Sequence, residues 1–295
     1  MKNEKKYSPI GGQAIIEGVM MRGTKAVSIA VRKPNGEIEM KTEPLKKSAL
    51  SWIGKVPLLR GAFALVSSMV IGVKALTYSA EFFMEDEEMA ESKFDLWLKD
   101  KFGEKAENLT VFFSILFAAV MSILMFAVAP TFLTSLFKSV VDNPLALSIF
   151  EGLLKIFIFL SYIFLISRLN DVKRVFQYHG AEHKSIHCLE SGQELTVENA
   201  QKFGTLHPRC GTSFLLIVMT ISIVIFTFVG WGSPVLRVVF KILLFPFVAG
   251  VSFEIIRWAG TSNNIIVRAI SYPGMMLQKM TTNAPDDKQV EVALA

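Results

Sequence analysis

Three of the chain's 4 histidines lie in one short window whose spacing suits a metal ion. The window reads FQYHGAEHKSIHCLE, from Phe176 to Glu190, and His179, His183 and His187 follow one another at intervals of four residues. On a helix this spacing stacks the three side chains on one face. Two neutral imidazoles one helical turn apart can bind a single divalent ion, which is why the spacing recurs in zinc sites. The window therefore predicts a helix that carries metal ligands.

The same window supplies a candidate general base. HGAEH, residues 179–183, matches H-x-x-E-H, the inverse of the metallopeptidase motif H-E-x-x-H. In such motifs the glutamate is the general base for a water molecule whose pKa the metal lowers toward neutrality. Helical geometry places Glu182 and Glu190 on the histidine face and Cys188 on the opposite face. Glu182 is therefore the predicted catalytic residue.

A second group of ligand side chains follows the window. The segment LHPRCGTS, residues 206–213, carries His207 and Cys210 on a stretch that proline and glycine are expected to bend. Three consecutive helical turns are too long for one compact three-histidine site, so we expect the helix to be distorted or to stop early. The segment with His207 and Cys210 could fold back to complete a site of three or four ligands. The predicted metal ligands are His179, His183, His187, His207 and Cys210.

The ligand types favour a divalent metal. Imidazole and thiolate donors point first to zinc, with iron or manganese behind it. Three protein ligands and an open position would make the metal catalytic, whereas a closed His/Cys set would make it structural. The alternative to a metal is that these histidines cap helices, bind headgroup phosphates or hydrogen-bond within a loop.

The elements that must position these residues belong to a membrane protein. The chain of 295 residues is 52% hydrophobic and contains 24 Phe. Four apolar stretches are long enough to cross a bilayer, and they are residues 111–129, 145–166, 213–229 and 235–253. A fifth stretch, 56–83, has a short uncharged core and basic flanks. It predicts a re-entrant or interfacial helix, with a fifth span as the alternative.

The distribution of basic residues predicts the topology. The loop from Arg168 to Thr212 holds six Lys and Arg, against one in residues 138–145 and none in residues 230–234. By the positive-inside rule this loop and both termini lie in the cytoplasm. The polar first residues lead into no apolar core, so no cleavable signal is expected. In a reducing compartment Cys188 and Cys210 are not expected to form a disulfide.

The expected fold is mainly α, a polytopic helical membrane protein with a small N-terminal cytoplasmic β module. In that module Pro34-Asn35-Gly36 predicts a hairpin turn between two strand-like runs. The β module is predicted at 1–55. Residues 56–108 are expected to hold an interfacial or re-entrant helix and then an amphipathic helix around 85–105. A four-helix transmembrane domain at 109–258, with the cytoplasmic His-rich loop 168–212, and a cytoplasmic tail at 259–295, disordered after Gln278, complete the chain.

Charged residues within the predicted spans need partners. Glu151 and Lys155 lie one turn apart on the second span, and Arg237 and Lys241 lie one turn apart on the fourth. We expect these residues to pair with one another and to snorkel toward the interface. The alternative is a conduction or proton path.

Three further charged residues have two interpretations each. Glu17 and Arg22 lie in GGQAIIEGVMMRG, which is either a strand with loop glycines or a segment that contributes to a site. Glu254, near the end of the fourth span, either supplies a carboxylate to the site or pairs with Arg257 one turn on.

Four motifs in order carry a resemblance to a known family. GGQAIIEGVMMRG, YHGAEHKSIHCLE, HPRCGTSF and FEIIRWAG together resemble the YqhQ-like family of uncharacterised bacterial membrane proteins, which is described as a predicted metal-dependent enzyme family. The similarity runs from about Ile10 to Gln278. It implies a multi-pass protein of a bacterial cytoplasmic membrane and supplies no substrate.

Two classes of function follow from these patterns. The first is an integral membrane metallohydrolase with its site on the cytoplasmic face, acting on a membrane-adjacent peptide or a lipid headgroup. The second is a non-enzymatic scaffold or assembly factor whose metal joins the loop 168–212 to the helix ends. Transport is a third and weaker option, because four spans make a thin pathway without a homo-oligomer. The net charge of +5 suits anionic membrane lipid and not nucleic acid, since no basic stripe with interleaved aromatic residues accompanies it.

Overall fold

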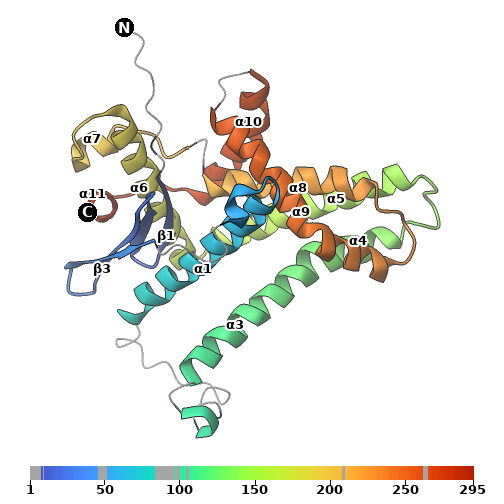
Figure 1. Cartoon of the computed structure of the whole chain (residues 1–295), viewed down its shortest axis with the longest axis horizontal. Coiled ribbons are helices and arrows are strands. Elements are labelled where there is room, and N and C mark those ends of the chain that lie inside the picture. Colours follow the sequence, from blue (N-terminus) through green and yellow to red (C-terminus); the bar gives the residue numbers. More distant parts are fainter. Residues whose placement is uncertain are drawn as a thin grey trace. The chain divides into compact units, whose positions relative to one another are not determined.

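The computed structural model describes residues 8, 10–45, 52–83, 97, 100–103, 106–207, 210–261 and 265–295. Within this part of the chain a small sheet is followed by a series of helices (Figure 1). The chain divides into two compact units. One comprises Met1–Phe83, Tyr162–Ser222 and Phe245–Ala295, and the other comprises Met84–Ser161 and Ile223–Leu244. All the predicted site residues belong to the first unit.

Helices dominate the described chain. They are η1 (Ile53–Lys55), α1 (Leu59–Glu81), α3 (Ala106–Ile123), the π-helical turn η3 (Leu124–Val128), α4 (Ala129–Ser135), α5 (Pro144–Ile166), α6 (Asn170–Ser191), α7 (Val197–Gln201), α8 (Gly211–Thr227), α9 (Pro234–Thr261), α10 (Ile265–Thr281) and α11 (Asp287–Leu294). The predicted class, mainly α with a small N-terminal sheet, is confirmed. Most of the amphipathic helix predicted around 85–105 lies outside the described residues.

Four described helices are long and apolar enough to cross a membrane, and they cover Leu59–Glu81, Leu109–Ser135, Pro144–Ile166 and Pro234–Trp258. The last three helices contain the predicted spans 111–129, 145–166 and 235–253. The remaining predicted span, 213–229, forms α8, which is shorter. Conversely α1 has the length of a span, because the helix continues through the basic residues that flank its uncharged core. The interfacial placement of α1 stays a prediction.

The sheet is an antiparallel meander of four strands. They are β1 (Gly11–Ile15), β2 (Gly18–Arg22), β3 (Ala26–Arg32) and β4 (Ile38–Pro44), adjacent in chain order. The predicted turn Pro34-Asn35-Gly36 joins β3 to β4. Gly36 has a φ of 88°, a conformation that glycine adopts without steric cost. The predicted hairpin is therefore confirmed.

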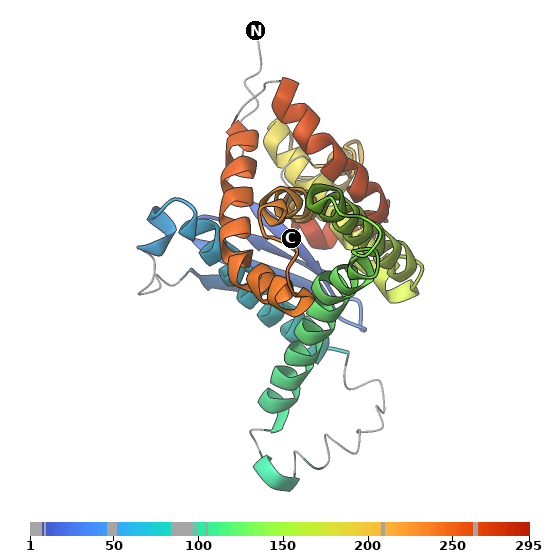
Figure 2. The same ribbon diagram turned by 90° about the vertical axis from the view of Figure 1, so that its right-hand side faces the viewer.

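Different helices bury the two faces of the sheet. Ile15 and Val31 are fully buried on the face that packs on Ala75 of α1. Val19, on the opposite face, packs with Tyr178 of α6 and with α11. Figure 1 and Figure 2 both show the sheet in blue beside α1. Alternate residues of a strand point to opposite faces. The sheet therefore packs on α1 with one face and on α6, which carries the histidines, with the other.

The C-terminal segment is ordered, so the prediction of disorder after Gln278 is wrong. Its last helix, α11, begins with a capping box in which Asp286 and Gln289 satisfy each other's backbone N–H groups. Val290 and Val292 of α11 are buried at 0% and 1% exposure. No neighbouring residues in the sequence could bury these two side chains. Its partners are α6 and the sheet, which tertiary folding brings to it.

The second unit contains a buried ionic network. Glu151 of α5 accepts hydrogen bonds from Arg237 (Nη2–Oε2 2.9 Å), from Lys241 and from Thr131 (Oγ1–Oε1 2.6 Å). The expected pairing is thus present, but it joins two helices. Arg237 is only 1% exposed, so these cations are enclosed by protein and do not snorkel. Lys155 lies with its ammonium 5.9 Å from the centre of the Phe226 ring.

Candidate metal centre

Helix α6 is the scaffold of the candidate centre, and it runs without distortion through all three histidines. It ends at Gly192, whose φ of 72° supplies the left-handed cap that commonly closes a helix. Gly180, in the middle of the helix, lies so close to the carbonyl of Asn283 that a Cβ would collide with it. The expected distortion of the helix does not occur. The ligand side chains instead divide into two clusters along its length.

The first cluster consists of His179, His183 and Cys210. One candidate ligand atom from each lies within 4.8 Å of those of the other two. His179 Nε2 is 3.1 Å from Cys210 Sγ, and the rings of His179 and His183 are 4.5 Å apart at their centres. Cys210, just before α8, therefore lies against α6, in agreement with the predicted fold-back.

The second cluster consists of His187, Glu190 and His207. Their candidate ligand atoms also lie within 4.8 Å of one another. His207 Nε2 is 3.7 Å from Glu190 Oε2, and the His187 and His207 ring centres are 4.7 Å apart. Sequence reasoning placed Glu190 on the histidine face and did not count it among the ligands. The two clusters adjoin, because the His183 and His207 ring centres are 5.6 Å apart.

Backbone carbonyls hold three of the imidazoles. The pairs are His179 Nδ1 with Thr281 O at 2.8 Å, His183 Nδ1 with Thr205 O at 2.5 Å, and His187 Nε2 with Leu206 O at 3.0 Å. Since a carbonyl oxygen can only accept, each of these nitrogens carries the hydrogen. In a neutral ring the other nitrogen then presents its lone pair. Metal-binding histidines are fixed in this way, by a hydrogen bond from the nitrogen that does not bind the metal.

One lone pair is buried without a partner. His183 is 1% exposed, and its Nε2 has no hydrogen-bond partner among the described residues. Leaving a buried polar atom unsatisfied costs about 1–3 kcal/mol, so an observed case needs an explanation. A cation bound between His183, His179 and Cys210 would satisfy it. The backbone N–H of Thr212 donates to Cys210 Sγ at 3.4 Å, which holds the sulfur in place beside His179. The donor set therefore fits a divalent metal.

Glu182 lies beside the first cluster but inside the protein. It is 5% exposed and packs against Gly12 of β1, whose backbone N–H donates a hydrogen bond to the carboxylate. Burial raises the pKa of Glu182 above its ordinary value, against the opposing effects of His179 and of the Gly12 hydrogen bond. A glycine at position 12 is required by this side chain, because there is no room for a Cβ.

Glu17 positions α6 on the sheet. It occupies the turn between β1 and β2 with a φ of 49° and accepts hydrogen bonds from Arg174 (Nη2–Oε2 2.6 Å) and from Tyr178 (Oη–Oε2 3.1 Å). Burial, with Glu17 adding to it, raises the pKa of Tyr178, and the hydrogen bond to Glu17 raises the pKa of Arg174. Glu17 therefore fixes the first half of α6 to the sheet, up to the residue before His179.

Arg22 and Glu254 belong to neither cluster, and both contact α1. Arg22 Nη1 is 3.4 Å from Ser68 Oγ of α1, which ties the sheet to that helix. Glu254 accepts a hydrogen bond from Arg60 Nε at 2.6 Å. This partner on α1 was in neither of the two interpretations of Glu254. Cys188 is buried in the packing on the opposite side of α6 from the histidines, as expected, and burial raises the pKa of its thiol.

Gln278 was missed by sequence reasoning, although it positions the second cluster. Its side chain is fully buried, accepts a hydrogen bond from His207 N at 2.8 Å and donates to His207 O at 2.8 Å. It also donates to Ser213 Oγ at 2.9 Å. A glutamine in an amphipathic helix near the end of the chain carries no local signal of such a role.

Comparison with known proteins places this chain in a family. Residues 56–295, which include both clusters, match the family described as Protein of unknown function (DUF1385). The chain is also 34% identical over 304 residues to Uncharacterized protein YqhQ of Bacillus subtilis (strain 168), an alignment that covers 100% of this chain and 92% of that protein. No solved structure matches the chain. This chain therefore belongs to the DUF1385 family of YqhQ-like proteins.

Proposed function

We propose that this protein is an integral membrane metal-dependent hydrolase. Its metal is held by His179, His183 and Cys210, and Glu182 is the general base. The observation that carries the proposal is the buried Nε2 of His183, which has no partner among the described residues. His183 also forms a cluster with His179 and Cys210 in which the candidate ligand atoms lie within 4.8 Å of one another. The carbonyl contacts support the proposal, because they engage Nδ1 of His179 and His183 and leave the Nε2 lone pair of each ring for a metal.

Zinc is the first candidate for this metal, with iron or manganese behind it. Two imidazoles and one thiolate are a zinc-type donor set, and three protein ligands leave a position open for water. His187 and His207, which we also expected to bind metal, form a second three-donor set with Glu190. The two sets adjoin, because the His183 and His207 ring centres are 5.6 Å apart, and hydrolases with two metal ions are a known class.

The chain's own residues would divide the reaction between them. A bound divalent ion would supply Lewis acidity and lower the pKa of a water molecule. The carbonyls of Thr281 and Thr205 hold the Nδ1–H groups of His179 and His183, so the Nε2 lone pairs would bind the metal and would not accept that water's proton. The Glu182 carboxylate would accept it. Burial raises the pKa of Glu182, and a carboxylate with a raised pKa is the stronger base.

The proposed location is the cytoplasmic side of a bacterial cytoplasmic membrane. Four described helices have the length and apolar character of spans, which is compatible with a multi-pass membrane protein. The excess of basic residues in the loop 168–212 supports the cytoplasmic side. A substrate at this level would be a membrane-adjacent peptide or a lipid headgroup.

A non-enzymatic scaffold with a structural metal is the second candidate. The observation in its favour is the burial of Glu182, which is 5% exposed and enclosed by β1. A base that is sealed in this way requires an opening of the β1–α6 contact before substrate enters, whereas a structural metal requires none.

Metal analysis of the purified protein tests the metal itself. The wild type should contain zinc in stoichiometric amount, and a His179→Ala/His183→Ala variant should lose it. Cys210→Ala should also lower the metal content. Cys188→Ala is the matched control, because that cysteine is buried away from both clusters and its loss should leave the metal in place. Equal and negligible metal in all four proteins would refute the proposal.

A Glu182→Gln variant separates enzyme from scaffold. The amide keeps the shape of the side chain and removes its basicity, so metal content should be unchanged. If the protein is a hydrolase, this variant should fail to complement a deletion strain. Full rescue by Glu182→Gln would reject the general-base assignment and favour the scaffold.

A further inference from the structure

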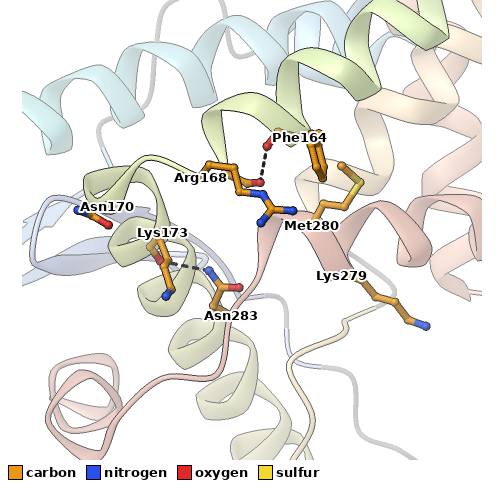
Figure 3. Close-up of a pocket in the computed structure, with 8 residues that line it drawn as sticks. Phe164, Arg168, Asn170, Lys173, Lys279, Met280 and Asn283 are labelled. Atoms are coloured by element: carbon orange, nitrogen blue, oxygen red, sulfur yellow. Dashed lines mark hydrogen bonds between the residues drawn. The ribbon is translucent and has the colours of Figure 1, made fainter.

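A cavity of about 470 Å³ lies in the first unit where the end of α5, the start of α6 and the end of α10 meet (Figure 3). Its lining includes three cationic side chains, Arg168, Lys173 and Lys279, and no acidic residue among those described. In Figure 3 the Arg168 side chain lies beside Met280 and the Lys173 side chain lies beside Asn283. Lys279 extends outward, away from both. This cavity is separate from both histidine clusters.

The cations of the cavity are not neutralised by the described part of the protein. None of the ion pairs among the described residues involves Arg168, Lys173 or Lys279. The guanidinium of Arg168 lies over the Phe164 ring, 4.5 Å from its centre. Asp171, in the first turn of α6, is the acidic residue nearest in sequence, and it does not line the cavity. Three cations beside one hollow, without a carboxylate in its lining, favour an anion.

The first turn of α6 adds backbone donors to these charges. This helix of 22 residues begins at Asn170, which lines the cavity, and no side chain caps it. The first N–H groups of a helix have no acceptor within the helix, and they lie at the positive end of its dipole. A phosphate group satisfies both the donors and the charge. The ligand chemistry is therefore that of a phosphate.

The surroundings of the cavity are apolar on the side of α5. That helix has the length and composition of a membrane span, and near its end Phe164 and Leu165 are 48% and 66% exposed. Leu169, between α5 and α6, is 57% exposed. A ligand that fits both the basic hollow and this uncovered apolar surface carries a phosphate and hydrocarbon chains. A free phosphate would leave the apolar surface uncovered.

We propose that this cavity binds the phosphate headgroup of an anionic phospholipid, with its acyl chains along the end of α5. Basic pockets at the cytoplasmic ends of membrane helices bind such headgroups. The site does not depend on the metal or on hydrolase activity. It accounts for the concentration of positive charge where α5 meets α6, which the metal centre does not use.

Native mass spectrometry of the full-length protein, titrated with phosphatidylglycerol or phosphatidylcholine of equal acyl chains, tests the proposal. The wild type should retain phosphatidylglycerol at least about 30-fold more tightly than phosphatidylcholine. Each cation near a phosphate is worth about fivefold in affinity, so Arg168→Gln/Lys173→Gln should weaken this binding by about 30-fold and leave phosphatidylcholine unchanged.

The control variant Lys202→Gln/Lys288→Gln removes the same charge from exposed positions outside the cavity. Its phosphatidylglycerol affinity should stay within about twofold of the wild type, since exposed charges at a distance are screened. An equal loss in this control would mean that binding follows net charge alone, and it would overturn the site. Equal binding by the wild type and Arg168→Gln/Lys173→Gln would also overturn it.

Two further measurements keep the test sharp. If the double variant does not fold, Lys279→Gln at the rim should still lower phosphatidylglycerol affinity about fivefold, and an unchanged affinity would refute the proposal. Inorganic phosphate should not displace bound phosphatidylglycerol. Displacement at millimolar phosphate would identify the ligand as a free phosphate and reject the lipid.

Discussion

Replacing Gly12 by alanine tests how tightly strand β1 encloses the Glu182 carboxylate. A Cβ at position 12 would lie 2.7 Å from Glu182 Cγ and 2.8 Å from both Cδ and Oε1. Carbon atoms in contact are about 3.5–4.0 Å apart, so one of the two groups must move by about 1 Å. Glu182 has little room to do so, because it is 5% exposed and hydrogen-bonded to the same strand. Overpacking of this kind costs about 1–3 kcal/mol.

Gly11→Ala is the matched control for this substitution. Gly11 is the preceding residue of the same strand, and a Cβ there would meet nothing within 4 Å. Both substitutions gain about 0.5–1 kcal/mol from replacing glycine in a strand. That gain cancels when the two variants are compared. The difference between their free energies of unfolding should therefore equal the collision with Glu182, about 1–3 kcal/mol.

Thermal unfolding of the two variants in the same detergent measures this difference. Gly12→Ala should melt below Gly11→Ala by about 2–4 °C for each kcal/mol. Combining Gly12→Ala with Glu182→Ala removes the colliding atoms, so the double variant should be more stable than the sum of the single effects by about 1–3 kcal/mol. Equal melting of the Gly11 and Gly12 variants, or additive effects in the double variant, would show that Glu182 does not occupy this place.

The remaining predictions concern a positioning side chain, the buried ionic network and the topology. Gln278→Ala should destabilise the protein by about 1–3 kcal/mol in thermal unfolding, because it leaves buried backbone groups of His207 unsatisfied. Arg237→Gln should destabilise it by about 3–5 kcal/mol, because it removes a partner of the buried Glu151 carboxylate, and adding Glu151→Gln should recover part of the loss. After replacement of Cys188 and Cys210, a membrane-impermeant thiol reagent applied to intact cells should label Asn143→Cys and spare Ser191→Cys.

Each of these predictions has a clear contrary outcome. Gln193 is exposed, and Gln193→Ala should be neutral; an equal effect at Gln278 and Gln193 would reject the positioning role. A Glu151→Gln/Arg237→Gln variant that is no more stable than Arg237→Gln would argue against the pairing. Labelling of Ser191→Cys with protection of Asn143→Cys would place the histidine clusters outside the cell and remove the cytoplasmic site from the proposed function.

The sequence alone was enough for the features that depend on near neighbours. The uncharged run 111–129 predicts a long apolar helix, and Pro34-Asn35-Gly36 predicts a hairpin turn, since both signals lie within a few residues of the structure they specify. The common face of His179, His183 and His187 follows from the helical repeat in the same way. These predictions agree with the structure because backbone conformation responds mainly to local side chains and glycine positions.

Only the tertiary structure decided how the ligands divide and what encloses them. Cys210 meets His179 while His207 meets Glu190, and that division depends on how the loop before α8 returns to α6. The burial of Glu182 depends on Gly12, which is 170 residues earlier in the chain. Contacts of this kind are set by the packing of the sheet, α6 and the C-terminal segment against one another. No periodicity within a single segment encodes them, because each partner gains burial only when the others are in place.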